Sequence, residues 1–152
     1  MTKSVADVMS PDPRVIARTA AVIEAAMIML EEDVGSVPVV EEDGTLAGIV
    51  TDRDIALRVV AAGRDPGTTY VEDVATANPH RADLDEPLDH AYERMATWRI
   101  RRLPVVADNR VVGMLAQADL VQEMKDKKAG QLVEEISQPG QPSYGKQETM
   151  VN

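Results

Sequence analysis

The segment Thr51-Asp52-Arg53-Asp54 brings a hydroxyl, two carboxylates and a guanidinium together directly after a short apolar run. A helix that begins directly after a strand leaves free backbone N–H groups and the positive end of its dipole at the turn, which suits a phosphate group. The Thr51 hydroxyl can donate a hydrogen bond to such a phosphate, and the ionised Asp54 carboxylate can accept from both O–H groups of a ribose. A structural alternative stays open, because a threonine with an acid three residues later also forms the capping box of helices that bind no ligand.

A second segment of the same pattern, Ala116-Gln117-Ala118-Asp119, follows another apolar run later in the chain. Asp119 keeps the acceptor carboxylate, whereas Ala116 has no hydroxyl with which to cap a helix or to donate to a phosphate. This segment is therefore the weaker candidate for an anion site. Arg53, which stands beside the first acidic position, is a candidate to reach toward the second site and replace the missing donor.

The densest positive cluster of the chain is Arg99-Ile100-Arg101-Arg102, which stands just before an apolar run that contains proline. A charge run of this kind is commonly a solvated face. Arginine also suits phosphate, because its planar fork can bond two phosphate oxygens at once. The equivalent positions of the first half hold Gly35 and Ser36, so the two halves differ in the charge that they offer to an anion.

These segments belong to a unit that occurs twice in the chain. The stretch 5–9 (VADVM) matches 71–75 (VEDVA), 37–40 (VPVV) matches 103–106 (LPVV), and 48–55 (GIVTDRDI) matches 113–120 (GMLAQADL). Self-similarity of this kind indicates two copies of one structural unit.

Each copy shows the same order of hydrophobic periods. Apolar residues three and four positions apart mark an amphipathic helix, and they are Val22, Ala25, Ala26 and Met29 in the first copy and Leu88, Ala91, Tyr92 and Met95 in the second. Thr19 and Asp85 are suitable N-cap residues for these helices. Two short apolar runs separated by a polar turn follow, and then a second helix, predicted over 52–62 in the first copy. The order in each copy is helix, strand, turn, strand, helix.

The repeat divides the chain into parts. We expect residues 1–63 to form the first motif, 64–70 a linker, 71–128 the second motif, and 129–152 a C-terminal extension that is partly flexible. Each motif is too small to close a hydrophobic core alone, so the two should pack against each other. A cleft between two such units is a common place for a small ligand.

The motif order of V-x-D-V-M, an amphipathic helix, h-P-V-V, a hairpin and G-h-h-T-x-x-D-h, where h is an apolar residue, resembles the CBS motif in both copies. A tandem pair of these motifs is known as a Bateman module. The segments TDRDIALRVVAAGRDP (51–66) and RRLPVV (101–106) look like those of the small stand-alone bacterial members of the family. The resemblance implies an α+β fold in which each motif is β-α-β-β-α and the two motifs pack through their sheets as a pseudo-twofold pair.

The resemblance also implies a regulatory ligand. Family members typically bind adenosine nucleotides (AMP, ADP or ATP), or sometimes S-adenosylmethionine, in a cleft between two motifs, and they signal through conformation or assembly. It assigns the phosphate and ribose roles described above to Thr51 and Asp54. It further implies that the residues before the proline strand of one motif point at the phosphates held by the other, so that Arg101 and Arg102 complete the Asp54 site.

An adenine ring would need an apolar slot beside these groups. The candidates on the neighbouring strands, each of which is also a candidate for the hydrophobic core, are Ile49, Val37, Pro38, Val15 and Ile16. Two modules of the family often join as a flat disc, so the resemblance implies a homodimer. A second hypothesis is a constitutive dimeric scaffold that presents an acidic surface to a partner protein without physiological nucleotide binding.

Composition excludes several other classes of protein. The 152 residues include 16 Lys and Arg against 26 Asp and Glu, for a formal net charge of −10. An acidic surface repels phosphate backbones, which argues against nucleic-acid binding. No apolar stretch approaches the roughly 20 residues of a membrane span, and the N-terminus lacks the apolar region of a signal peptide. Together with the absence of cysteine, these features predict a soluble protein of the reducing cytoplasm.

Groups for catalysis are scarce. The chain has no cysteine, and its two histidines, His80 and His90, have no zinc-ligand spacing. It contains no G-x-S-x-G, and the stretch 63–69 (GRDPGTT) lacks the lysine of a phosphate-binding loop. We therefore expect no enzyme activity, no catalytic cofactor and no metal site.

Overall fold

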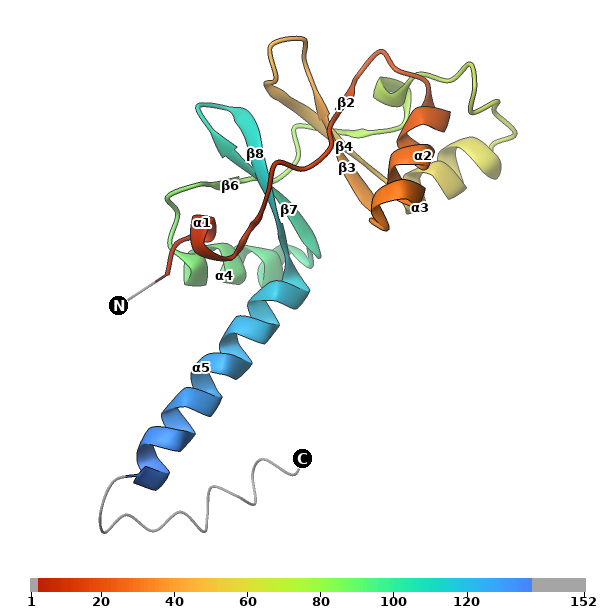
Figure 1. Cartoon of the computed structure of the whole chain (residues 1–152). Helices are drawn as coiled ribbons and strands as arrows, with labels where there is room; N and C mark the ends of the chain where they lie inside the picture. The colour runs from red at the N-terminus through yellow and green to blue at the C-terminus, as the bar shows by residue number, and fades with distance from the viewer. Residues whose placement is uncertain (1–2, 138–152) are drawn as a thin grey trace.

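The computed structural model describes residues 3–137 and the side chains of residues 3–129 (Figure 1). Its strands form two four-stranded sheets, in the orders β1-β8-β7-β6 and β2-β3-β4-β5. The strands are β1 (Ser10–Pro11), β2 (Ile16–Ala17), β3 (Ser36–Val40), β4 (Leu46–Thr51), β5 (Thr76–Ala77), β6 (Ala82–Asp83), β7 (Arg102–Ala107) and β8 (Arg110–Ala116). The helices are α1 (Val5–Val8), α2 (Val22–Glu32), α3 (Asp52–Ile55), the π-helix η1 (Ala56–Val60), the 3₁₀-helix η2 (Val71–Asp73), α4 (Leu88–Trp98) and α5 (Gln117–Ser137).

The predicted α+β fold is confirmed. The first motif runs β2-α2-β3-β4-α3 and the second β6-α4-β7-β8-α5, which is the β-α-β-β-α order in both. In each motif the hairpin strands pair antiparallel, and the short first strand adds to them in parallel. Figure 1 shows α2 and α3 flanking the first sheet and α4 flanking the second.

The two motifs exchange segments at their N-terminal sides. Strand β1 leaves the first motif and pairs with β8, while β5 pairs with β4 of the first motif. Val5 is fully buried in the second core, and Val71 is fully buried in the first. The division into residues 1–63 and 71–128 follows the repeat, whereas the packing ties each motif to a segment of the other.

Equivalent glycines allow the exchanged segments to approach. A Cβ on Gly48 would lie 2.7 Å from the Thr76 carbonyl oxygen, and one on Gly113 would lie 3.0 Å from that of Ser10. A side chain at either position would therefore collide with the backbone of the added strand. The glycine that both copies of the repeat share is thus explained by strand exchange.

The helix starts differ from the predicted caps. The N-cap residues of α2 and α4 are Ala21 and Pro87, so Thr19 and Asp85 were wrong. Neighbouring backbone satisfies the first N–H groups instead: Val22 donates to the Thr69 carbonyl at 2.9 Å, and Leu88 donates to that of Lys3 at 2.9 Å. A side-chain cap is unnecessary where another segment supplies the acceptor.

The helix predicted over 52–62 changes type along its length. It is α-helical through Ile55 and continues as the π-helix η1 to Val60. Gly63, with a φ of 71°, ends it in the left-handed conformation that favours glycine. The Arg58 guanidinium in η1 donates to the Val74 carbonyl at 2.9 Å and so holds the helix to the exchanged segment.

The two sheets meet at their hairpins. Val40, Leu46 and Val106 are buried although they belong to neither core cluster, and all three lie near a hairpin turn. The Leu46 N–H donates to the Asn109 carbonyl at 2.9 Å across the two hairpins. Apolar burial and backbone hydrogen bonds therefore join the motifs at this end of the module.

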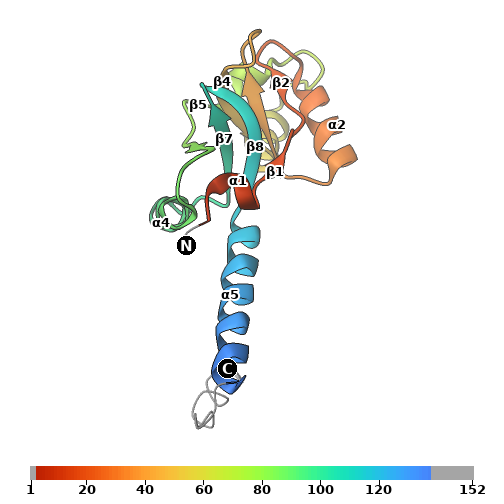
Figure 2. The same cartoon turned by 60° about the vertical axis from the view of Figure 1, so that its left-hand side comes forward.

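Helix α5 extends well beyond the second motif (Figure 2). The predicted C-terminal extension is thus helical from residue 129 to Ser137, and its remainder, 138–152, lies outside the described residues. None of the described helices combines the length and apolar character that a membrane span requires.

Candidate functional site

The turn from β4 into α3 places Thr51 and Asp54 in a reciprocal capping box. The Asp54 N–H donates to Thr51 Oγ1 at 3.1 Å, and the Thr51 N–H donates to Asp54 Oδ2 at 2.9 Å. The structural role considered from the sequence is therefore present. It leaves the Thr51 hydroxyl hydrogen and the second carboxylate oxygen of Asp54 available, so the same two residues can also contact a ligand.

Ser36 lies opposite Thr51 in the β3–β4 ladder and was missed as a site residue. Its side chain is 8% exposed, and its hydroxyl has no hydrogen-bond partner within the described part of the chain. A buried hydroxyl without a partner costs free energy, so such a group calls for an explanation. From the sequence alone, Ser36 is noted only as a residue without charge. The one feature of the sequence that could have pointed to this residue is its place directly before V-P-V-V.

Pro38 and Ile49 extend the same surface along the sheet. They pair with each other two residues further from the turn, and they therefore lie on the same face of the sheet as Ser36 and Thr51. Pro38 is buried and Ile49 is half-buried. The structure thus brings Ser36, Thr51, Pro38 and Ile49 together on one face of the first sheet.

Two of the predicted adenine contacts lie on the other side. Val37 (1% exposed) and Ile16 (6%) are members of the first hydrophobic core. Because alternate residues of a strand face opposite sides of the sheet, Val37 cannot share the face of Pro38. The core alternative is correct for both residues. Val15, which precedes β2, is 39% exposed.

The arginine cluster lies at the second turn. Arg102 pairs with Ala116, and the Gln117 N–H donates to the Arg101 carbonyl at 2.8 Å. Within residues 3–129, neither arginine side chain has a hydrogen bond or ion pair, to Asp54 or to any other residue. Strand pairing places both arginines beside the turn of Asp119, and the expectation that they also complete the Asp54 site stays a prediction.

The two turns therefore offer different groups. The first offers the Thr51 and Ser36 hydroxyls with Asp54, and the second offers Arg101 and Arg102 with Asp119. Asp119 is half-buried and Arg53 is exposed. The difference between the two halves of the sequence therefore appears in the structure as a difference between the two turns.

Neither turn belongs to the larger hollows of the described residues. A groove of about 910 Å³ lies between α4 and α5, and a hollow of about 170 Å³ lies beside β4 and β5, where Arg18 contacts Glu41 and Glu72. Thr51 and Asp54 are half-buried on the surface of the first motif. In the part of the chain that the structure describes, no group of three or more His, Asp or Glu side chains could hold a metal ion.

A family comparison identifies the repeat. The profile described as "CBS domain" matches residues 5–61 and 71–126, which is most of the chain. The chain belongs to the CBS-domain family. The resemblance stated from the sequence is thereby confirmed.

Curated relatives include short CBS proteins of similar length. CBS domain-containing protein YhcV of Bacillus subtilis is 41% identical over 135 residues, which cover 88% of this chain and 95% of that protein. Hypoxic response protein 1 of Mycobacterium tuberculosis is 29% identical over 133 residues, which cover 88% of this chain and 93% of that protein. The chain therefore resembles small stand-alone family members.

Solved CBS pairs share the fold and two of them contain adenosine compounds. The pair of protein MJ0100, in complex with 5′-methylthioadenosine and S-adenosyl-L-methionine, has a TM-score of 0.73 and 32% identity, covering 84% of this chain and 99% of that chain. CBSX2 in complex with AMP has a TM-score of 0.70 and 27% identity, covering 82% of this chain and 98% of that chain. Another solved structure of CBSX2 is of the protein from Arabidopsis thaliana. The structure of Hypoxic Response Protein I, with two coordinated zinc ions, has a TM-score of 0.73 and 29% identity, covering 79% and 98%.

Some relatives are enzymes of much greater length. L-aspartate semialdehyde sulfurtransferase of Methanocaldococcus jannaschii is 34% identical over 117 residues, but these cover only 22% of that protein. The similarity is thus confined to a CBS region within a larger chain. Support for a ligand-binding regulatory module comes instead from the family match and from the CBS pairs solved with adenosine compounds.

Proposed function

We propose that this protein is a regulatory module that senses an adenosine nucleotide (AMP, ADP or ATP) between its two CBS motifs. The observation that carries the proposal is the face formed by Ser36, Thr51, Pro38 and Ile49, in which a buried hydroxyl has no partner beside a helix start. Adenosine compounds bound to related CBS pairs support the ligand class. The proposed module has no enzyme activity and no catalytic cofactor.

Each group of this face has a part in the proposed binding. The adenine ring packs on Pro38 and Ile49, where apolar surface is available beside the turn. The ribose hydroxyls donate to the free oxygen of Asp54, which accepts only when ionised. The Thr51 and Ser36 hydroxyls donate to the first phosphate, together with backbone N–H groups at the start of α3.

The second turn is proposed as a more cationic site. Arg101 and Arg102 have no anionic partner among the described side chains, so they can neutralise a phosphate without first breaking an ion pair. Asp119 supplies the ribose acceptor there. Without a hydroxyl at Ala116, this site depends on charge more than on hydrogen bonding, and Arg53 stays a candidate contributor.

Binding at either turn can change how the motifs pack. The exchanged strands β1 and β5 and the Arg58–Val74 hydrogen bond link each turn to the other motif. We propose that occupancy is transmitted through these links to a homodimer formed by exposed helix faces, in the cytoplasm. A partner protein is a further possible recipient of the signal.

The second candidate function is a constitutive dimeric scaffold without physiological nucleotide binding. The completed capping box favours it, because the Thr51–Asp54 turn is already satisfied without a ligand. Under this proposal the turn serves stability alone, and no nucleotide changes the free energy of unfolding.

Thermal unfolding with AMP, ADP, ATP and S-adenosylmethionine, each at about 1 mM, distinguishes the two. A ligand at roughly 100 times its Kd stabilises the folded state by about 2.7 kcal/mol, which raises Tm by roughly 5–10 °C for a chain of this size. The sensor predicts a selective rise that is lost in Asp54→Ala and kept in the exposed control Asp43→Ala. If none of the four ligands raises Tm, the scaffold is favoured.

A further inference from the structure

The loops that lead into the two motifs have the same backbone but different side chains. Each loop begins at a residue with a φ of 48°, which is Asp12 before β2 and Asn78 before β6. Aspartate and asparagine tolerate this left-handed conformation better than other residues with a side chain. A proline follows in both loops, and the next residue is Arg14 in the first motif and His80 in the second.

The long helices α2 and α4 also end in the same way. The residues after them, Asp33 and Arg99, have φ values of 54° and 55° and turn the chain in the left-handed region. Arg14 reaches the end of α2 from the entry loop. Its guanidinium forms ion pairs there with the Glu31 carboxylate and, at 3.8 Å, with that of Glu32. We call this contact the first link.

The second motif joins the same two places with aromatic rings. The ring centroids of His80 and Trp98, the last residue of α4, lie 5.0 Å apart, and the ring planes are inclined by 31°. His80 follows Arg14 by 66 residues and Trp98 follows Glu32 by 66 residues, so the repeat places both contacts at equivalent positions. Two different chemistries therefore join the entry loop to the helix end. We call the aromatic contact the second link.

The electrostatics of the helix end explain the arginine of the first link. The end of α2 carries Glu31, Glu32 and Asp33 in succession and no basic residue. The C-terminal end of a helix favours cations and disfavours acids. Arg14 supplies the positive charge from a separate segment of the chain, whereas α4 is followed by Arg99 in its own sequence.

Each of these helix ends leads within a few residues to a turn of the candidate site. The Asp52 N–H donates to the Gly35 carbonyl at 2.9 Å, and a Cβ on Gly35 would lie 3.0 Å from the Asp52 carboxylate. In the second motif the Gln117 N–H donates to the Arg101 carbonyl at 2.8 Å. Asp52 and Gln117 are the first residues of α3 and α5, the helices that begin at the two turns. A continuous path thus runs from each link to a turn.

From this arrangement we propose that Arg14 and His80 are positioning residues for the two turns. Each holds the end of a long helix against the entry loop, so that the carbonyl of Gly35 or Arg101 stays opposite the first N–H group of the next helix. The first link is roughly half exposed and is screened by salt, whereas the aromatic second link is not. The inference rests on the proposed function for the ligand that these turns bind.

A positioning role predicts a local effect. An exposed ion pair contributes little to the free energy of unfolding of a whole domain. Loss of either link should therefore loosen the turn to which it leads, while the two hydrophobic cores stay as stable as before. Backbone amides report such local opening through their rates of hydrogen exchange.

Amide hydrogen exchange of the full-length protein, followed residue by residue by NMR, tests the two links without a ligand. We expect Arg14→Gln to speed exchange of the Asp52 amide at least threefold and to leave the Gln117 amide unchanged. His80→Ala should have the reverse effect on these two amides. Arg14→Lys keeps the positive charge and should keep exchange at Asp52 close to the native rate.

Ionic strength provides an independent readout of the first link. Salt at about 500 mM shortens the range of electrostatic interactions several-fold relative to about 20 mM. In the native protein this change should speed exchange of the Asp52 amide toward the rate of Arg14→Gln. The Gln117 amide should exchange at the same rate over this range of salt, because the second link is not an ion pair.

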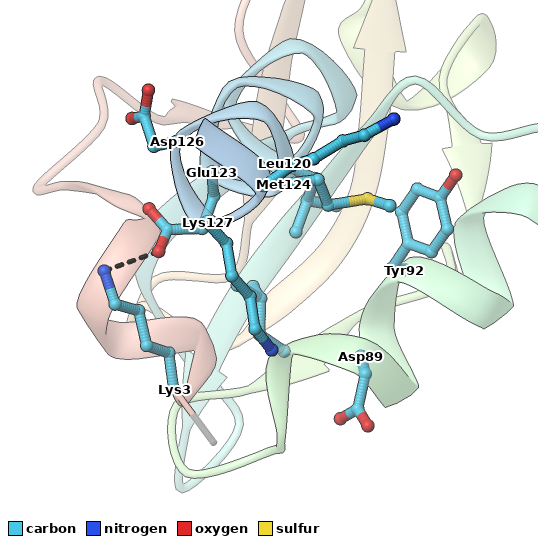
Figure 3. Close-up of a pocket in the computed structure, with 10 residues that line it drawn as sticks. Lys3, Asp89, Tyr92, Leu120, Glu123, Met124, Asp126 and Lys127 are labelled. Atoms are coloured by element: carbon cyan, nitrogen blue, oxygen red, sulfur yellow. Dashed lines mark ion pairs between the residues drawn. The ribbon is translucent and has the colours of Figure 1, made fainter. Parts of the chain in front are cut away.

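Two control variants remove exposed ion pairs elsewhere. Arg64→Gln removes the contact with Asp73, whose side chains are about as exposed as those of the first link. Lys3→Gln removes the ion pair with Glu123 in the groove between α4 and α5 (Figure 3). Neither pair lies at the end of α2 or α4, so the first amides of α3 and α5 should exchange at their native rates in both variants.

Two exchange results would overturn the proposal. An unchanged rate at Asp52 in Arg14→Gln would show that the first link does not hold the turn. Uniform acceleration of all amides in that variant would show that Arg14 acts on global stability alone.

Calorimetric titration with AMP, ADP, ATP and S-adenosylmethionine separates this inference from nucleotide sensing. For a compound that binds the native protein, Arg14→Gln should weaken binding at the Thr51–Asp54 turn at least threefold in low salt, and an unchanged affinity would contradict positioning. If none of the four compounds binds while the exchange results hold, the proposed function fails and the two links stand.

Discussion

Thr51 and Asp54 have one role that the structure shows, the capping box, and one that we propose, contact with a ligand; the sequence pattern predicts both. A threonine followed three residues later by an aspartate predicted a capping box, and the two hydrogen bonds of that box are present. The partner that the sequence did not reveal is Ser36. Its importance depends on burial without a hydrogen bond, which is a property of the folded chain and leaves no signal in a residue pattern.

Removal of the Ser36 hydroxyl is predicted to have opposite effects on stability and on nucleotide affinity. Ser36→Ala removes a buried polar group that has no partner, so the free energy of unfolding should stay unchanged or rise by about 1 kcal/mol. Nucleotide affinity should fall, because a donor to the phosphate is lost. Urea denaturation measures the first effect and calorimetric titration the second. A loss of stability of more than about 1 kcal/mol would show that the hydroxyl has a structural partner after all.

Asp43 at the first hairpin turn predicts a pH dependence. Hydrogen bonds from the side chain and backbone N–H of Thr45 lower the pKa of this carboxyl below its ordinary value. A carboxylate with a lowered pKa stabilises the folded state fully above its ordinary pKa, and this contribution is lost as the pH falls through the lowered value. A titration of the Asp43 carboxyl by NMR should therefore give a depressed pKa, and an ordinary or raised one would contradict the turn geometry.

Elements were predicted well wherever local pattern decides them. The two amphipathic helices, the hairpins and their order follow from spacings within a few residues. The helix caps and the strand exchange could not be predicted in this way, because the acceptors at Thr69 and Lys3 and the strand partners of β1 and β5 come from distant parts of the chain. The change to a π-helix at Ala56 likewise has no local signal that distinguishes it from an α-helix.

The exchange predicts a specific sensitivity at Gly48. Gly48→Ala places a methyl group 2.7 Å from the Thr76 carbonyl oxygen, so β5 must move away from β4. We expect a loss of about 1–3 kcal/mol of unfolding free energy, as for overpacked sites. The matched control is Gly67→Ala, whose nearest neighbour is the Asp65 carboxylate at 3.3 Å and not a backbone atom. Equal stability of both variants in urea would contradict the close approach of β5.

At the scale of the whole molecule, strand pairing determines which residues lie beside each of the two turns. The β7–β8 register places Arg101 and Arg102 beside the turn of Asp119, and their contribution to a ligand at Asp54, which the resemblance implies, stays a prediction. A repeat reveals that two turns exist, but only the register shows which residues stand at which turn. The acidic net charge of −10 makes this local cationic cluster the exception on the molecule.

Isothermal titration of the native protein, Asp54→Ala and Asp119→Ala with AMP, ADP, ATP and S-adenosylmethionine tests the central claim most directly. We predict that at least one of these compounds binds the native protein, and that Asp54→Ala weakens or abolishes one binding event while Asp119→Ala leaves that event intact. Circular dichroism of both variants serves as the control for folding. Binding that is unchanged in a folded Asp54→Ala protein, or no heat with any of the four compounds, would contradict nucleotide sensing at this turn.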